Sequence, residues 1–236
     1  MVIDIYYKKN KNKGLFADLE KYNFSDLQNY IPIYNNFFEL NESNWNSINL
    51  NNKNTISSIH SKKEGIYEIY NIYNQNRKIK TVFAKLSPIL DPIKYMCGKY
   101  KDLSENSICE LPEFNKTVNF KKDNVNNVSY IDGFFYYLSS KLLHDYNFYN
   151  GTDYFGSYLG NKNDFQINIY DDIEYLQENP YFLENNNKLF KIDDTLQVDI
   201  LNFDTRRNKN KLNLDSNIET LSVNSLDEIE DLNCIF

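Results

Sequence analysis

The runs Gly65-Ile-Tyr-Glu-Ile-Tyr-Asn-Ile-Tyr73 and Arg77-Lys-Ile-Lys-Thr-Val-Phe-Ala-Lys85 flank the short segment Asn74-Gln-Asn76 and decide the fold of the central part of the chain. Polar and apolar residues alternate along both runs, which is typical of β-strands with one half-buried face. Asparagine tolerates the positive φ of a tight turn. The sequence therefore predicts a two-stranded hairpin over residues 65–86, with Lys85 at the end of its second strand.

The residues from Tyr130 to about Asn147 carry the strongest helix prediction in the chain. Apolar side chains recur there at the i, i+3 and i+4 spacing of an amphipathic helix, and they are Ile131, Phe134, Phe135, Leu138, Leu142 and either Leu143 or Tyr146. We expect Phe135 and Leu138 to hold this helix against a sheet. We expect Lys141 to lie on the solvent side of the helix.

A second hairpin is predicted where Gly151–Gly160 and Phe165–Tyr170 flank the polar segment Asn161–Asp164. Both flanks are short, rich in aromatic or β-branched residues, and bounded by turn-forming residues. The predicted fold class is α+β, with antiparallel β-hairpins at 65–86 and 153–170 packed against a central amphipathic helix.

Composition divides the chain into three parts. Residues 1–64 are interpreted as an N-terminal extension, residues 65–204 as the α+β domain, and residues 205–236 as an acidic tail. Within the second part, Leu196–Phe203 predicts a last strand. The tail has too few large apolar residues to bury a core, so we expect it to be disordered.

The formal net charge is −7 and the sequence pI is about 5.0. Phosphate binding needs an excess of Lys and Arg on one face, so this balance argues against a nucleic-acid partner. The basic runs Lys8–Lys13 and Arg206–Lys211 are better explained as solvated loops. No window approaches the roughly 18 to 20 apolar residues of a membrane span, and the N-terminus lacks the order of a signal peptide. We therefore expect a soluble, intracellular protein without a membrane partner.

The segment Val82-Phe-Ala-Lys85 has the layout in which protein kinases place the lysine that contacts the α- and β-phosphates of ATP. The alternative is an edge-strand lysine that extends into water and blocks sheet-to-sheet pairing. A kinase lysine needs a Gly-rich loop upstream, where this chain offers only Gly65, and an acidic partner on the following helix. That helix has no Glu, which leaves Asp132 and Asp145 as shorter substitutes. The His-Arg-Asp and Asp-Phe-Gly motifs are absent from the sequence, so no catalytic residue and no metal ligand is assigned.

The remaining candidate residues have structural explanations that we favour. The three cysteines and two histidines lack the spacing of a disulfide framework or a zinc site. The acidic pairs Asp171–Asp172 and Asp193–Asp194 are better explained as helix caps than as catalytic carboxylates. His144 is expected to be a partly buried structural histidine rather than a member of a catalytic triad. Trp45 is expected to pack its loop onto the sheet rather than to stack on a ligand.

Three stretches carry a resemblance to a known family: Val82-Phe-Ala-Lys-Leu-Ser-Pro-Ile-Leu-Asp-Pro-Ile-Lys-Tyr-Met-Cys-Gly-Lys-Tyr100, Ser129-Tyr-Ile-Asp-Gly-Phe-Phe-Tyr-Tyr-Leu-Ser-Ser-Lys-Leu-Leu143, and Asp153-Tyr-Phe-Gly-Ser-Tyr-Leu-Gly160 with Asp171-Asp-Ile-Glu-Tyr-Leu176. Together they resemble the N-terminal part of a protein-kinase-like family of giant DNA viruses. The resemblance spans roughly residues 65–200.

The resemblance implies an elaborated, incomplete kinase N-lobe that belongs to a serine/threonine protein-kinase-like protein. It implies ATP as the cofactor, Lys85 as the residue that binds it, and a catalytic lobe that follows the acidic tail. The chain alone is then inactive, its partner is the downstream catalytic lobe or another protein, and its place is the host cytoplasm or the virion. The alternative is a non-catalytic viral protein-interaction module that uses its sheet to bind a partner chain.

Overall fold

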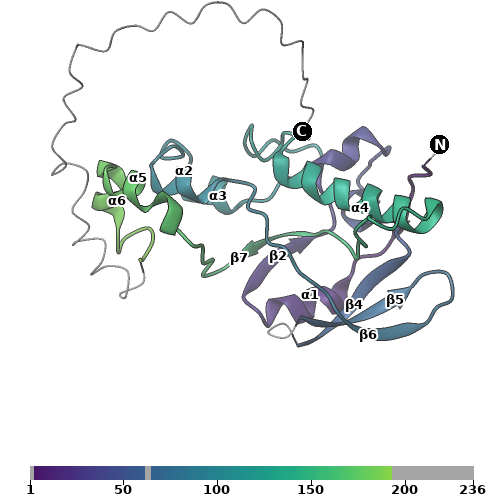
Figure 1. The fold of residues 1–236 in the computed structure, drawn as a ribbon. Helices are drawn as coiled ribbons and strands as arrows, with labels where there is room; N and C mark the ends of the chain where they lie inside the picture. The colour runs from purple at the N-terminus through teal and green to yellow at the C-terminus, as the bar shows by residue number, and fades with distance from the viewer. Residues whose placement is uncertain (1–2, 62–64, 193–236) are drawn as a thin grey trace, which may run out of the picture. The chain divides into compact units, whose positions relative to one another are not determined.

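The computed structural model describes residues 3–61 and 65–192, and Figure 1 follows the chain through them. The strands in chain order are β1 (Tyr7–Lys9), β2 (Phe24–Gln28), β3 (Ile48–Leu50), β4 (Asn54–Ser61), β5 (Ile66–Asn71), β6 (Arg77–Thr81) and β7 (Leu159–Lys162). The α-helices are α1 (Lys13–Glu20), α2 (Pro92–Met96), α3 (Glu105–Cys109), α4 (Val128–Tyr146), α5 (Ile173–Gln177) and α6 (Pro180–Asn185). Three short 3₁₀ turns complete the description: η1 (Pro32–Asn36), η2 (Trp45–Ser47) and η3 (Tyr170–Asp172). The chain is thus a mixed α and β structure, as predicted.

The strands of the described chain form three small antiparallel sheets, with orders β1-β3, β2-β7 and β4-β5-β6. The predicted hairpin is confirmed, because β5 pairs with β6 from Ile66 opposite Thr81 to Tyr70 opposite Arg77. The partner on the other edge of β5 is β4, which comes from the first 64 residues. Residues before and after position 64 therefore share one sheet. The predicted strand Leu196–Phe203 and the tail 205–236 lie outside the described residues.

The second predicted hairpin is wrong. Strand β7 pairs with β2, with Phe24 opposite Lys162 and Gln28 opposite Leu159, and a bulge interrupts the register between Ser25 and Gln28. Residues 165–169, which were expected to form the return strand, have no regular secondary structure, and η3 follows them. Within the predicted first flank, 151–160, only the last two residues belong to a strand. The sequence pattern there does not identify which strand supplies the partner hydrogen bonds.

Helix α4 confirms the predicted amphipathic helix. Its N-terminus is capped by Asn127, whose side-chain oxygen accepts a hydrogen bond from the Ser129 N–H at 3.0 Å. Such a cap satisfies one of the backbone donors that the first turn leaves free. At its C-terminus Asn147 takes the left-handed conformation with φ 56°, which asparagine accepts more readily than most residues. The helix ends there.

The buried side of α4 agrees with the prediction only in part: Phe134 is buried and Leu138 packs against the core, whereas Ile131 and Phe135 are exposed. The side chains that face the core are Tyr130, Phe134, Tyr137, Ser140 and Lys141. Phe135 is 66% exposed, whereas Phe134 is only 7% exposed. The predicted roles of Phe135 as a core anchor and of Lys141 as a surface residue are therefore wrong.

Hydrogen bonds make the tyrosine-lined side of α4 suitable for burial. The Tyr130 hydroxyl donates to the Lys122 carbonyl at 2.8 Å, and the Tyr137 hydroxyl bonds to the Asn51 side chain. Burial raises the pKa of Tyr137 well above its ordinary value. With their hydroxyls satisfied, both rings bury large apolar areas. They pack into a core that also contains Ile31, Ile33, Tyr34, Ile48, Leu50, Leu111, Tyr154 and Leu159.

No helix among the described residues is long and apolar enough to cross a membrane.

Candidate functional site

Lys85, the one residue predicted to bind a cofactor, does not lie on a strand. Strand β6 ends at Thr81. One more backbone hydrogen bond joins the two sides of the hairpin after it, from the Val82 N–H to the Gly65 carbonyl at 2.8 Å. Residues 82–88 then continue without regular secondary structure. Phe83 is 88% exposed rather than half-buried. The predicted position of Lys85 at the end of a strand is therefore wrong.

The segment that carries Lys85 is held against the first turns of α4. The Ser129 hydroxyl donates to the Pro88 carbonyl at 2.8 Å, and the Ser87 hydroxyl bonds to the same Ser129 hydroxyl at 3.0 Å. One residue farther on, the Asn127 amide donates to the Ile89 carbonyl at 3.0 Å. The start of α4 thus holds this segment through two side-chain hydrogen bonds to its backbone and one between the Ser87 and Ser129 side chains.

The Lys85 ammonium is paired with Asp132 of α4. Its Nζ lies 2.6 Å from Asp132 Oδ2, and the two side chains are 48% and 33% exposed. The hydrogen bond with Asp132 raises the pKa of Lys85 above its ordinary value. The ammonium also lies 5.7 Å from the centre of the Tyr136 ring. A pair this exposed contributes at most about 1 kcal/mol to stability, so its main effect is to neutralise both charges locally.

The two carboxylates that the sequence offered as partners for Lys85 have different roles. Asp132 is the one in contact, whereas Asp145 lies 2.6 Å from the ammonium of Lys141 on the same helix. The Lys85–Asp132 pair joins the segment after the hairpin to the following helix. This is the connection that a kinase-type lysine requires, made here with an aspartate.

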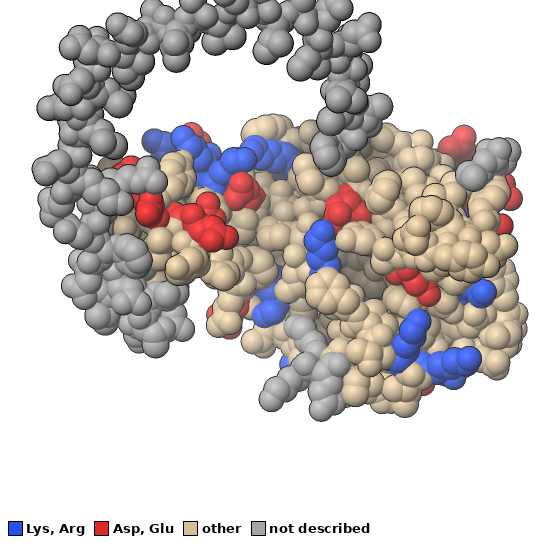
Figure 2. Space-filling view, in the orientation of Figure 1, with Lys and Arg blue, Asp and Glu red and all other residues tan. Residues whose placement is uncertain are grey.

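Exposed apolar side chains lie near this ion pair in sequence, on α4 and on the segment that carries Lys85, and sequence reasoning missed them. We call this group the α4 outer face and define it by Phe83, Leu86, Val128, Ile131 and Phe135. Their exposed fractions are 88, 47, 80, 45 and 66% respectively. On the helix these positions recur at i, i+3 and i+7, so they share one side. In Figure 2 the surface over α4 is mostly tan, with a few red and blue side chains within it.

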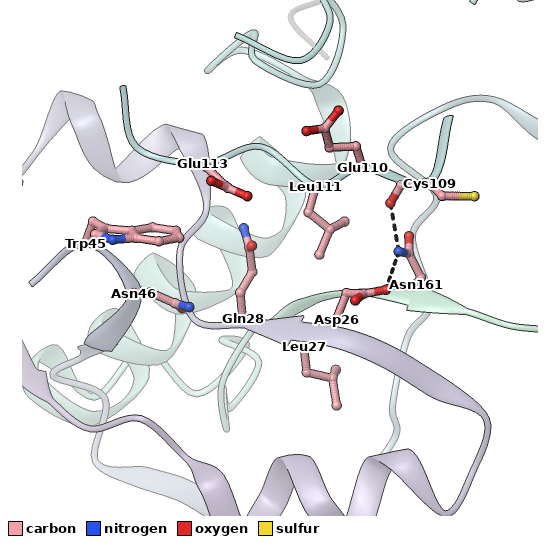
Figure 3. Close-up of a pocket in the computed structure, with 10 residues that line it drawn as sticks. All are labelled: Asp26, Leu27, Gln28, Trp45, Asn46, Cys109, Glu110, Leu111, Glu113 and Asn161. Atoms are coloured by element: carbon pink, nitrogen blue, oxygen red, sulfur yellow. Dashed lines mark hydrogen bonds between the residues drawn. The ribbon is translucent and has the colours of Figure 1, made fainter. Parts of the chain in front are cut away.

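A cavity of about 680 Å³ lies elsewhere, between β2, η2, β7 and the loop at 109–113 (Figure 3). Its lining consists of Asp26, Leu27, Gln28, Trp45, Asn46, Cys109, Glu110, Leu111, Glu113 and Asn161. Trp45 packs edge-on against Tyr30 with ring centres 5.6 Å apart. The tryptophan therefore has a packing contact, but with Tyr30, which follows β2, rather than the predicted contact with the sheet that follows its own loop, and it also lines this cavity.

The carboxylates of the cavity have partners within the chain. Lys116 forms ion pairs with Glu110 and, at 3.6 Å, with Glu113. The Asn161 amide donates to Asp26 at 2.9 Å and to the Cys109 carbonyl at 2.7 Å, as Figure 3 shows. Asp26, Glu110 and Glu113 therefore each have a partner within the chain, which gives these carboxylates a structural role.

His144 does not belong to a catalytic relay in this arrangement. Its Nε2 lies 2.9 Å from Asp153 Oδ1, and the Ser140 hydroxyl donates to the same oxygen at 3.0 Å. A serine-histidine-aspartate relay needs the serine on the histidine, whereas here both contact the carboxylate. The described residues also contain no group of three or more His, Cys, Asp and Glu side chains that could hold a metal ion.

The chain matches no protein-family model, no curated protein and no solved structure. The resemblance to a viral kinase-like family therefore stays a prediction.

Proposed function

We propose that this chain is a non-catalytic protein-interaction module that binds through the α4 outer face. The observation that carries the proposal is the exposure of five large apolar side chains on one helix and the segment fixed beside it. The largest exposed apolar patch on a folded chain is often a functional surface. The surface differs from the sheet that the sequence suggested as the binding element.

The segment beside α4 is held in one conformation, which favours a binding role for its exposed side chains. The three hydrogen bonds at the start of α4 and the ion pair of Lys85 hold Leu86 and its neighbours in place before any partner arrives. A surface that is already ordered loses little conformational entropy when a partner docks. Exposed aromatic side chains such as Phe83 and Phe135 are the type that supplies most of the energy at interfaces.

A photo-reactive phenylalanine analogue at position 135 tests this proposal in cells that make the protein. We expect irradiation to give covalent protein adducts at position 135. The same analogue at position 183 is the matched control, because Leu183 is 57% exposed on α6 but lies outside the α4 outer face. An absence of adducts at position 135, or equal adducts at both positions, would contradict the proposal.

A second candidate function is the nucleotide lobe of a viral protein-kinase-like protein, and the Lys85–Asp132 ion pair favours it. In kinases the corresponding pair between a lysine and a helix carboxylate holds the lysine ready for the phosphates of ATP. Titration of the chain with ATP separates the two functions. Saturable binding that is lost in Lys85→Met and weakened in Asp132→Asn supports the nucleotide lobe. If the chain does not bind ATP, or if neither substitution changes its affinity for ATP, the result supports the interaction module instead.

Phosphoryl transfer by this chain alone is not expected in either case. The sequence offers no His-Arg-Asp base and no Asp-Phe-Gly metal ligand, and both groups are needed for the reaction. Incubation of the purified chain with labelled ATP and a protein substrate checks this directly. Transfer that disappears in Lys85→Met would show that the chain is an enzyme.

A further inference from the structure

The cavity between β2, η2, β7 and the loop at 109–113 has a size and a lining suited to a small molecule. Its volume of about 680 Å³ falls within the range of small-molecule sites. The buried Leu111 and the half-buried Trp45 give it apolar walls, and Figure 3 shows the Gln28 side chain between them. Small-molecule sites combine such walls with a few polar groups that select the ligand.

The charges of the lining favour a cation. Of the described residues that line the cavity, three are carboxylates and none is a lysine or arginine. Asp26 receives its hydrogen bonds from neutral side chains, and Glu110 and Glu113 share the ammonium of Lys116. Even with the buried Lys122, which donates to two nearby backbone carbonyls, three carboxylates face two cations. The cavity therefore carries an excess of negative charge.

An acceptor without a partner is a second and independent observation. Gln28 is 6% exposed, and its Nε2 donates to the Tyr30 carbonyl at 3.1 Å and to the Pro112 carbonyl at 2.8 Å. These two bonds fix the amide, and its Oε1 has no hydrogen-bond partner among the residues that the structure describes. An unpaired acceptor on a buried side chain costs free energy. A ligand in the cavity that carries N–H donors would remove this cost.

Glu113 and Trp45 complete a set of groups that favours a cationic nitrogen. Glu113 Oε1 lies 3.6 Å from Lys116 Nζ, which is longer than a hydrogen bond, so this carboxylate can still accept from a ligand. Tryptophan is the aromatic side chain whose ring face attracts cations most strongly. A guanidinium or ammonium group in the cavity therefore meets a carboxylate, an amide oxygen and an indole ring, and each of them stabilises it.

We propose that this cavity binds a small organic cation, a guanidinium or primary ammonium group on a short aliphatic chain. The cationic group lies against Gln28, Glu113 and Trp45, and the aliphatic chain packs on Leu111. The inference goes beyond the proposed function, because it concerns another part of the chain and another class of ligand. Failure of either one does not decide the other.

Titration of the full chain with butylguanidinium in low salt, followed by tryptophan fluorescence, tests the inference. Trp45 is the single tryptophan of the chain, so excitation at a wavelength that tyrosine does not absorb reports on the cavity alone. We expect a saturable change in emission. N-butylurea is the matched neutral ligand of similar shape, and its dissociation constant should be at least about tenfold higher.

Substitutions separate the cavity from the rest of the surface. Glu113→Gln removes one negative charge with little change in shape and should raise the dissociation constant for butylguanidinium at least about tenfold. Glu20→Gln removes the same charge from an exposed position at the end of α1, outside the cavity, and should leave the constant unchanged. Trp45→Leu, measured by calorimetry because the fluorescent reporter is lost, should also weaken binding. Circular dichroism checks that each variant is folded.

Three results would overturn the inference. The absence of any saturable response to butylguanidinium would exclude a cation site in the cavity. Equal affinities for butylguanidinium and N-butylurea would show that the cavity does not select for charge. An affinity for butylguanidinium that neither Glu113→Gln nor Trp45→Leu changes would place the bound cation elsewhere on the chain.

Discussion

Phe134 and Phe135 are adjacent on α4, and replacing each with alanine tests which side of the helix faces the core. Phe134 is 7% exposed and stacks on Phe37, with ring centres 4.4 Å apart. It also contacts Tyr137 with ring centres 5.4 Å apart. Removal of a buried phenylalanine ring typically costs about 3 to 5 kcal/mol, because transfer energy is lost and a cavity remains. We expect a loss in this range for Phe134→Ala.

The matched variant Phe135→Ala should cost much less. This side chain is 66% exposed, so only about a third of it is removed from water. Full burial of a phenylalanine is worth about 1.5 to 3 kcal/mol, which gives about 0.5 to 1 kcal/mol here. The gain in helix propensity on substitution by alanine is the same at both positions and cancels in the comparison.

Urea unfolding followed by circular dichroism measures both losses. The chain should be dilute, because any association through the exposed Phe135 would add stability that depends on concentration. Equal losses, or a larger loss for Phe135→Ala, would mean that the buried and exposed sides of α4 are reversed.

Three further results are expected. Lys141→Ala should destabilise the chain by about 2 kcal/mol in the same urea assay, because the aliphatic part of the lysine is buried and its ammonium pairs with Asp145 one helical turn later. A loss of stability below about 0.5 kcal/mol would mean that Lys141 lies on the surface. Asp132→Asn should lower the pKa of Lys85 in a side-chain NMR titration. Since Lys85 has a raised pKa in the folded chain, its stabilising contribution is full below the ordinary value of 10.5 and fades as the pH rises through the raised value, so the variant should lose that alkaline dependence. Gly98→Ala should lower the melting temperature, since φ is +75° there and an added Cβ would lie 2.7 Å from the Tyr181 ring; an unchanged melting temperature would contradict this.

Local patterns predicted the elements whose partners are close in sequence. The hairpin over 65–86 has alternating residues on both strands and an asparagine-rich turn between them, so its partner could be read directly. Strand β7 has no such neighbour. Its partner β2 lies more than a hundred residues earlier, and alternation alone does not select between distant strands.

Spacing identified the buried face of α4 only in part, because apolar residues cover more than one side of the helix. Phe134 and Phe135 are equally apolar, so the choice depends on the hydrogen bonds available to their neighbours. Tyr137 finds Asn51 inside the core, a contact between residues far apart in sequence. A pattern of apolar residues carries no information about such a partner.

Lys85 shows the same limit at the candidate site. The sequence correctly supplied Asp132 as one of two carboxylates for the lysine, because both lie on the next long helix. It placed Lys85 on a strand because Val82 and Phe83 continue the apolar alternation. The last backbone bond of the β5–β6 pair runs from Val82 to Gly65, and residues 83–85 follow without regular secondary structure.

The most direct test of the α4 outer face as a docking surface is the ¹⁹F signal of 4-fluorophenylalanine at position 135. Its shift between H₂O and D₂O reports contact with solvent. We expect a large solvent shift in the dilute chain, because Phe135 is 66% exposed, and a small one when a second copy or another partner covers the helix. A small shift at every concentration would mean that Phe135 is buried within the chain. A large shift that persists at high concentration and in extracts of cells that make the protein would mean that nothing docks on this surface.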